Sequence, residues 1–238
     1  MSSFSLMNSQ KTIIFLHGWG LSSEVFKPLS YYMKDDFFVY APDLPGFGKS
    51  PIEKPMILKD YADFIYKFIR DNNIKEPIIV GHSFGGVAAI ELAILYPESM
   101  SKLILVGAPA IRKPNLKIKL LRKIAGILKY FFPKKTRKFI LKLFQLDASD
   151  YALIAKPHLK ETFKNIINEN LAPELQLIKI PVLVIWGEKD AVTPLSEGKL
   201  IAETIPDAKL VVVKNAGHFL FLEKPDEFIT LIKEFASS

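Results

Sequence analysis

The fold is decided by the stretch Pro77-Ile78-Ile79-Val80-Gly81-His82-Ser83-Phe84-Gly85. The apolar run 77–80 is typical of a buried strand, and the small residues after it predict an immediate turn into a helix. In the pattern Gly-x-Ser-x-Gly the serine backbone is strained, so the residues two positions away on either side must be small. Gly81 and Gly85 meet this requirement. The stretch therefore predicts a nucleophile elbow that presents the Ser83 hydroxyl at the end of a strand.

A serine hydroxyl at such a turn needs an adjacent base. The chain has four histidines, His17, His82, His158 and His218. We expect His82 to point to the opposite side of the strand from the serine. His17 belongs to a different motif, and His158 lies in a polar helical stretch and is expected on the surface. His218 follows the β-branched run 209–213, so it is predicted beyond the carboxyl end of a strand, where function concentrates in open α/β sheets. We predict that His218 is the base.

The base in turn needs a carboxylate to orient it. Residues 181–186 are predicted to form a buried strand, and Gly187-Glu188-Lys189-Asp190 follows it directly. Asp190 is the better candidate, and Glu188, which is nearer to the strand end, is its competitor. The chain order Ser83, Asp190, His218 differs from the orders of chymotrypsin and of subtilisin.

Acyl transfer also needs donors for the developing oxyanion. The predicted strand 12–16 runs into His17-Gly18-Trp19-Gly20, whose glycines leave the Trp19 N–H free to point into the site. The Phe84 N–H, at the start of the predicted helix, is the second expected donor, because unpaired amides and the helix dipole favour negative charge there.

Together these motifs resemble those of the α/β-hydrolase superfamily. The matching pieces extend from about residue 11 to the C-terminus, and they are 17–20, 43–50, 81–86, 187–190 and 217–218. The resemblance assigns them to the oxyanion loop, a turn packed on the sheet, the nucleophile, the acid and the base. We interpret the turn Asp43–Ser50 as structural, because its proline and glycines are sufficient to shape a loop. Haloalkane dehalogenases and epoxide hydrolases of the superfamily carry aspartate at the elbow, so Ser83 points away from them.

The resemblance is incomplete at the N-terminus. Superfamily members usually begin with an antiparallel hairpin, but only about ten residues precede the predicted strand 12–16, so Phe4–Met7 is expected to form at most one remnant strand. Those residues have neither the basic start nor the long apolar run of a signal peptide. No stretch reaches the length of a membrane span, so a cytoplasmic location is expected.

Composition and alternation indicate the fold class. The chain has 238 residues, of which 49% are hydrophobic, and it contains no cysteine. Predicted strands at 12–16, 37–41, 77–81, 102–107, 181–186 and 209–213 alternate with helical patterns such as 59–72 and 226–235. Short apolar strands separated by helices predict an α/β fold with a mostly parallel sheet covered on both faces. We expect the core to be formed by 1–107 and 181–238, and 108–180 to form an inserted helical cap, as the resemblance implies.

The expected cap is strongly basic. Residues 108–146 contain twelve Lys or Arg and no Asp or Glu, against a net charge of +7 for the whole chain. Three interpretations stay open: a solvated face, attraction to an anionic membrane surface or lipid, or docking of an acidic carrier protein. The third is suggested because 17–21, together with 24–26, is similar to the oxyanion region of pimeloyl-carrier-protein methyl ester esterases of biotin synthesis, whose partner is acidic. No nucleic-acid-binding motif accompanies the charge.

The sequence thus predicts a serine hydrolase that cleaves carboxylic esters through an acyl-enzyme, with Ser83, Asp190 and His218 as a triad. The apolar residues of the cap favour an apolar acyl or aryl substrate. No metal or organic cofactor is implied. The alternatives are a C–C bond hydrolase of ring-cleavage products, a carrier-protein methyl ester esterase and, less favoured, a binding protein without turnover.

Overall fold

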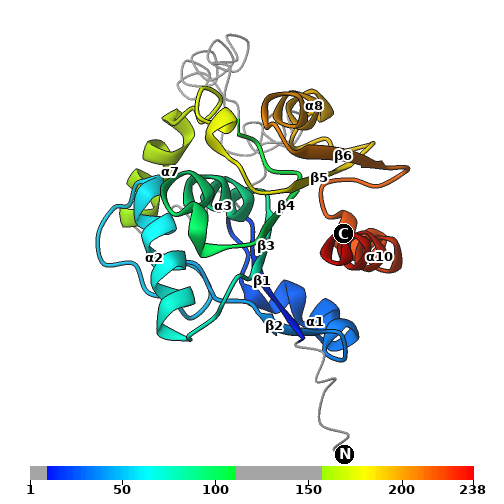
Figure 1. Ribbon diagram of the computed structural model, residues 1–238. Helices are drawn as coiled ribbons and strands as arrows, with labels where there is room; N and C mark the ends of the chain where they lie inside the picture. The colour runs from blue at the N-terminus through cyan, green and yellow to red at the C-terminus, as the bar shows by residue number, and fades with distance from the viewer. Residues whose placement is uncertain (1–9, 111–156) are drawn as a thin grey trace, which may run out of the picture.

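Six parallel strands form one sheet in the computed structural model, which describes residues 10–110 and 157–238 (Figure 1). Their order across the sheet is β2-β1-β3-β4-β5-β6, and every neighbouring pair is parallel. The strands are β1 (Lys11–Leu16), β2 (Phe37–Tyr40), β3 (Ile78–His82), β4 (Lys102–Val106), β5 (Val182–Gly187) and β6 (Ala208–Val213). Because all six run the same way, their carboxyl ends share one edge of the sheet.

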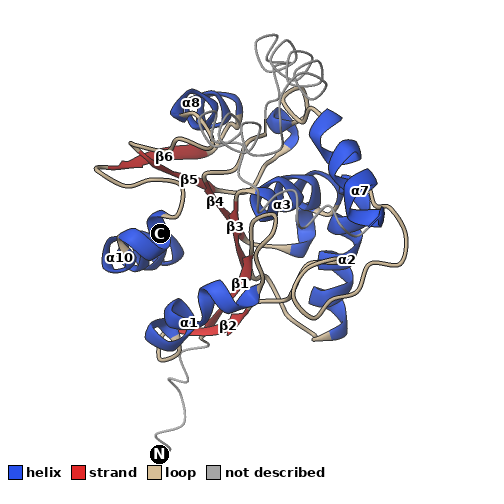
Figure 2. Ribbon diagram, turned by 180° about the vertical axis from the view of Figure 1, so that it is seen from behind, coloured by secondary structure: helices blue, strands red, loops and turns tan. Residues whose placement is uncertain are grey.

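Helices cover both faces of this sheet (Figures 1 and 2). The α-helices are α1 (Lys27–Met33), α2 (Leu58–Asp71), α3 (Phe84–Leu95), α7 (Pro157–Asn168), α8 (Leu195–Thr204), α9 (Leu220–Glu223) and α10 (Pro225–Ser237). Short 3₁₀ turns lie at η1 (Ser23–Phe26), η2 (Pro97–Ser99) and η3 (Leu175–Leu177). Helices α2, α3 and α8 contribute to one layer of the core, and α1, α9 and α10 to the other.

The alternation of side chains along the strands explains the two layers. In β1, Ile14 packs with the layer of α2 and α3, whereas its neighbours Ile13 and Phe15 pack with the layer of α1 and α10. All three side chains are buried, as expected for a parallel strand covered on both sides. Burying one aliphatic or aromatic side chain stabilises a fold by about 1.5–3 kcal/mol, so the apolar strands stabilise the sheet on both faces.

The predicted α/β fold is confirmed, and the expected strands and helices lie within about two residues of the observed ones. The expected strand 4–7 and most of the expected cap, including its basic segment, lie outside the described residues. The end of the expected cap is described as α7 and η3. It is tied to the chain around α2, because Met56 N–H donates to Thr162 Oγ1 (2.9 Å) and Leu58 N–H donates to Glu169 Oε1 (3.1 Å).

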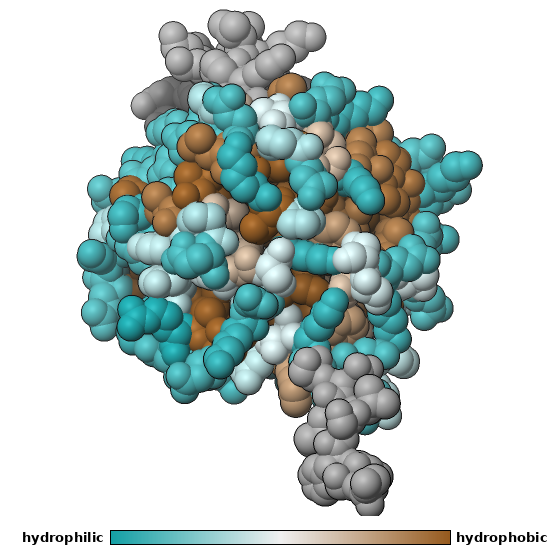
Figure 3. Space-filling model, viewed as in Figure 1, coloured by the Kyte–Doolittle hydropathy of each residue, from teal (hydrophilic) through white to brown (hydrophobic). Residues whose placement is uncertain are grey.

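The surface shown in Figure 3 intersperses polar and apolar side chains. Among the described residues, no helix has both the length and the apolar character required to cross a membrane.

Candidate active site

Ser83 occupies the turn between β3 and α3. Its backbone has φ 51° and ψ −118°, a left-handed conformation that a residue with a side chain rarely adopts. Such strain costs on the order of 1–3 kcal/mol and persists only where the surroundings impose it. Here Ser83 N–H donates to the Val106 carbonyl at the end of β4 (2.9 Å), and the Ser83 carbonyl accepts from Gly86 and Val87 (3.0 and 3.1 Å). The turn is therefore fixed from both sides by backbone hydrogen bonds.

Close backbone contacts explain the two glycines of the motif. A Cβ on Gly81 would lie 2.4 Å from Gly86 Cα, and a Cβ on Gly85 would lie 2.3 Å from the Leu16 carbonyl oxygen. Both neighbours are backbone atoms, which cannot move aside cheaply. The structure thus requires glycine at both positions.

Asp190 and His218 lie side by side on the loops after β5 and β6. His218 Nδ1 is 2.8 Å from Asp190 Oδ2, and the two side chains are only 7% and 1% exposed. Burial alone would raise the pKa of Asp190, but hydrogen bonds from His218 and Thr193 outweigh it and hold the pKa below its ordinary value. The carboxylate is therefore ionised near neutral pH and accepts the Nδ1–H of His218. Glu188 instead accepts the Asn215 N–H and is exposed.

Ser83 and this pair meet at the end of β4. Ser83 is hydrogen-bonded to Val106, and a Cβ on the next residue, Gly107, would lie 3.2 Å from both Asp190 Oδ2 and His218 Nδ1. The structure contains no hydrogen bond from the Ser83 hydroxyl to another described residue. The three predicted residues thus gather at one edge of the sheet, with a direct contact between two of them.

The two expected oxyanion donors are also neighbours. The rings of Trp19 and Phe84 lie 5.2 Å apart. Phe84 begins α3, so its N–H has no partner within the helix. A Cβ on Gly18, beside Trp19, would lie 3.3 Å from Ser83 Cβ, so the loop after β1 passes close to the serine.

His82 lies against the expected base, a contact that the sequence did not reveal. The rings of His82 and His218 are 4.7 Å apart, and His82 Nε2 is 3.1 Å from the His218 carbonyl oxygen. Burial and the nearby His218 lower the pKa of His82 to about 3. The neutral ring must therefore carry its proton on Nε2 and donate it to that carbonyl. Through this hydrogen bond His82 supports the backbone of His218. The alternation of side chains along a strand cannot predict such a contact with a distant loop.

The remaining motif residues have structural partners. His17 is buried; its Nε2 accepts the Leu44 N–H (3.0 Å), while its Nδ1 is 2.9 Å from the Gly18 carbonyl. Asp43 accepts the N–H groups of Ser23 (2.7 Å) and Lys49 (2.8 Å) and so fixes its loop, in agreement with the structural interpretation of that turn. His158 is partly exposed on α7.

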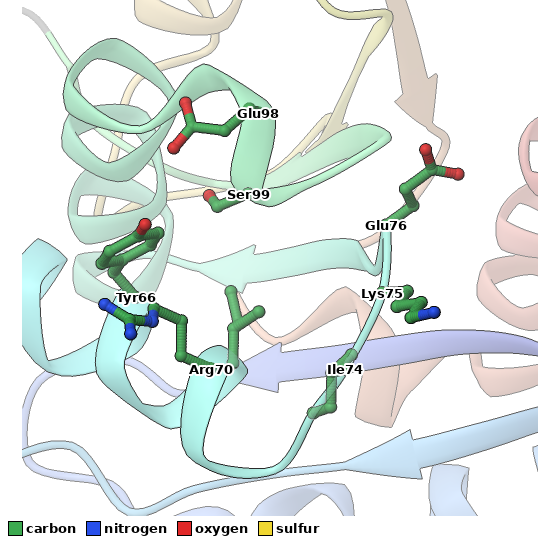
Figure 4. A pocket seen from close by; sticks show the side chains of 8 residues that line it. Tyr66, Arg70, Ile74, Lys75, Glu76, Glu98 and Ser99 are labelled. Atoms are coloured by element: carbon green, nitrogen blue, oxygen red, sulfur yellow. The ribbon is translucent and has the colours of Figure 1, made fainter.

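A cavity of about 520 Å³ opens at the other edge of the sheet, near the amino ends of the strands (Figure 4). Its lining comprises Tyr66, Ile69, Arg70, Ile74, Lys75, Glu76, Glu98 and Ser99. None of the candidate catalytic residues is among them. Within residues 10–110 and 157–238, no group of three His, Cys, Asp or Glu side chains is arranged to hold a metal ion.

The geometry places this chain in a known class. Residues 13–231 match the alpha/beta hydrolase family, and the chain belongs to that family. This agrees with the sheet of parallel strands, the elbow after β3 and the resemblance of the sequence motifs.

The chain is similar to several individual proteins over most of its length. The chain is 27% identical over 245 residues to the pimeloyl-[acyl-carrier protein] methyl ester esterase of Photorhabdus laumondii. The aligned region covers 95% of this chain and 92% of that protein. It is 30% identical to the AB hydrolase superfamily protein YisY of Bacillus subtilis, over 96% of this chain and 92% of that protein. Among solved structures, a thermophilic esterase from Thermogutta terrifontis has a TM-score of 0.75 at 22% identity, covering 95% and 89% of the two chains.

Proposed function

We propose that the chain is a carboxylic ester hydrolase in which Ser83 is the nucleophile, His218 the general base and Asp190 the residue that orients it. The observation that carries the proposal is the buried 2.8 Å contact between His218 and Asp190, at the sheet edge where the strained turn presents Ser83. Because Asp190 accepts the Nδ1–H of His218, the Nε2 lone pair is left to take a proton. Membership of the alpha/beta hydrolase family supports this assignment.

The reaction follows from these roles. Ser83 Oγ attacks the ester carbonyl and gives its proton to His218 Nε2, while the N–H groups of Trp19 and Phe84 donate to the oxyanion. When the tetrahedral intermediate collapses, the C–O bond to the alcohol breaks and His218 returns the proton to the leaving oxygen. A water molecule gives a proton to His218 and attacks the acyl-enzyme; when the bond from the acyl carbon to Ser83 Oγ breaks, His218 returns that proton to Ser83 Oγ and the acid is released.

The test is steady-state hydrolysis of p-nitrophenyl esters from acetate to palmitate, with wild type and Ser83→Ala measured side by side. We expect turnover by the wild type and a loss of about 10⁴-fold or more in the variant. The optimal chain length measures the acyl pocket. Equal activity of the two proteins contradicts the assignment of Ser83. A folded wild type that cleaves no ester but consumes a ring-cleavage dienol favours the C–C bond hydrolase.

A more specific candidate is an esterase that acts on the methyl ester of a pimeloyl group held by an acyl carrier protein. Two observations favour it. Relatives 27–28% identical over nearly the whole chain carry that name, and residues 108–146 contain twelve basic and no acidic residues, which suits an acidic partner. The test compares methanol release from the carrier-bound methyl ester with release from dimethyl pimelate. A preference for the carrier-bound ester that disappears at high salt supports the candidate, and equal rates contradict it.

A further inference from the structure

Thr193 carries a buried hydroxyl to which the proposed reaction gives no role. The residue lies on the loop between β5 and α8, three positions after Asp190, and is 6% exposed. Its Oγ1 lies 2.9 Å from Asp190 Oδ2, 3.2 Å from the Gly107 carbonyl oxygen and 3.3 Å from His218 Nδ1. One hydroxyl thus touches both members of the acid–base pair and the end of β4.

The backbone of Thr193 is anchored on both sides, so the position of the hydroxyl is fixed. Its N–H donates to Asp190 Oδ1 (2.9 Å), which also accepts the Val192 N–H (2.8 Å). Its carbonyl accepts the indole N–H of Trp186 (3.0 Å), a fully buried side chain of β5. Both oxygens of the Asp190 carboxylate therefore receive a hydrogen bond from the same residue or its loop.

A hydroxyl has one proton, and here it has two acceptors within reach. The carboxylate oxygen of Asp190 is nearer than the Gly107 carbonyl, and a charge-assisted hydrogen bond is about twice as strong as a neutral one. The proton therefore goes to Asp190 Oδ2. The Thr193 oxygen then presents a lone pair toward the Nδ1–H of His218, which points mainly at Asp190.

We infer that Thr193 is a positioning residue of the catalytic pair: its hydroxyl holds the Asp190 carboxylate and the His218 ring in the geometry needed for proton transfer to Nε2. The inference rests on the proposed function. In addition to orientation, the hydroxyl bond takes up part of the carboxylate's negative charge. Without it, Asp190 attracts the proton of His218 more strongly. Among the described residues, His82 also faces His218, and the substitution leaves it unchanged.

The test is Thr193→Val, which replaces the hydroxyl by a methyl group of similar size, with Thr193→Ser as the variant that restores it. Loss of one hydrogen bond to a charged group predicts a fall in kcat of about tenfold, with KM within about twofold of the wild type. The pH dependence of kcat/KM is expected to shift as well, because the Asp190 carboxylate then keeps more of its negative charge. Thr193→Ser should restore both values. A purely structural role would lower stability without the selective fall in kcat and without the shift in pH dependence.

The matched control is Thr204→Val, in which the lost hydroxyl donates to the Leu200 carbonyl of its own helix α8. It should leave kcat and the pH profile unchanged. A Thr193→Val protein that is folded and has the wild-type rate and profile overturns the inference. If the wild type hydrolyses no ester, the proposed function fails separately. The downfield proton resonance of His218 Nδ1–H, identified by its absence in His218→Gln, then tests the contact without turnover, and an unchanged resonance in Thr193→Val overturns it.

Discussion

The two halves of the candidate site lie on either side of the end of β4 and are held by different means. Ser83 is held by its backbone: a left-handed turn, three main-chain hydrogen bonds and close contacts at glycine. Asp190 and His218 are held by side chains: their own contact, the Thr193 hydroxyl and the His82 ring. The nucleophile half, which is Ser83 and its turn, thus depends on close packing of backbone atoms. The acid–base half, which is Asp190 and His218, depends on hydrogen bonds between side chains. Substitutions in the two halves should therefore fail in different ways.

Among substitutions that leave Ser83 in place, the largest loss of turnover is expected in the acid–base half. Asp190→Asn keeps the size of the side chain but offers an amide where His218 needs a carboxylate, so the ring is held in the wrong tautomer. We expect kcat on a p-nitrophenyl ester to fall by about 10³–10⁴-fold with little change in stability. Glu188→Gln is the control, because Glu188 bonds the Asn215 N–H instead, and it should retain activity. A fall below tenfold for Asp190→Asn would remove Asp190 from the mechanism.

Substitutions at the glycines of the nucleophile half should instead lower the stability of the fold. Gly81→Ala places a Cβ 2.4 Å from Gly86 Cα. Both atoms belong to the backbone of the turn, so the clash can be relieved only if the turn itself moves. We expect the free energy of unfolding in urea to fall by about 1–3 kcal/mol or more. At Gly217 the first atom that a Cβ would meet is the end of the Glu223 side chain, which can move, so Gly217→Ala should cost less. Equal losses would contradict the spatial account of the elbow.

A third prediction concerns His82, which supports the acid–base half and makes the stability of the fold depend on pH. Burial and the proximity of His218 lower the pKa of His82 to about 3, against 6.5 for an unfolded histidine. Between these values the unfolded chain binds the extra proton, so stability rises with pH across this window. Through His82 alone, the wild type should lose about 2 kcal/mol between pH 7 and pH 5. His82→Gln should remove this loss.

Denaturant unfolding at the two pH values measures this difference, with His158→Gln as the control on α7. The control should keep the wild-type pH dependence. A His82→Gln protein that still loses the same stability between pH 7 and pH 5 would show that His82 takes up its proton without unfolding.

The smallest effect is expected on α3, the helix that begins at the elbow. Burial, and then the nearby Glu169 and Glu174, raise the pKa of Glu91 to about 6. Between the unfolded value and pH 6 the folded chain binds the extra proton, so this group lowers stability as pH rises through the window. Because Glu91 is only half-buried, Glu91→Gln should add less than about 1 kcal/mol at pH 8 and nothing at pH 4. Thermal unfolding at the two pH values measures this change in stability. Substitution of the exposed Glu203 on α8, Glu203→Gln, is the control.

The sequence predicted the nucleophile half better than the acid–base half, for a physical reason. The elbow is local: Gly81, Ser83 and Gly85 are neighbours in the chain, and short-range sterics alone determine their pattern. The contact of Asp190 with His218 spans 28 residues, yet it was predictable because both follow parallel strands, whose carboxyl ends share one edge.

The supporting residues of the acid–base half were not predicted. His82 contacts the His218 ring through the approach of a distant loop, which strand alternation does not describe. Thr193 did have a signal, since an aspartate side chain commonly accepts N–H groups two or three residues further along the chain. The bounds of each strand also differed by one residue at one or both ends, because hydrogen bonds to neighbouring strands, not apolar runs, determine where strands end.

The most direct test of the central claim is covalent labelling with a p-nitrophenyl alkylphosphonate, which forms a stable bond with an activated serine. The rate of labelling is followed by intact-protein mass, and the modified residue is located by peptide sequencing. We expect one adduct, on Ser83, which forms in the wild type, is absent in Ser83→Ala and forms at least about 100-fold more slowly in His218→Ala. Labelling of another residue, or labelling of Ser83 at the same rate without His218, would contradict it.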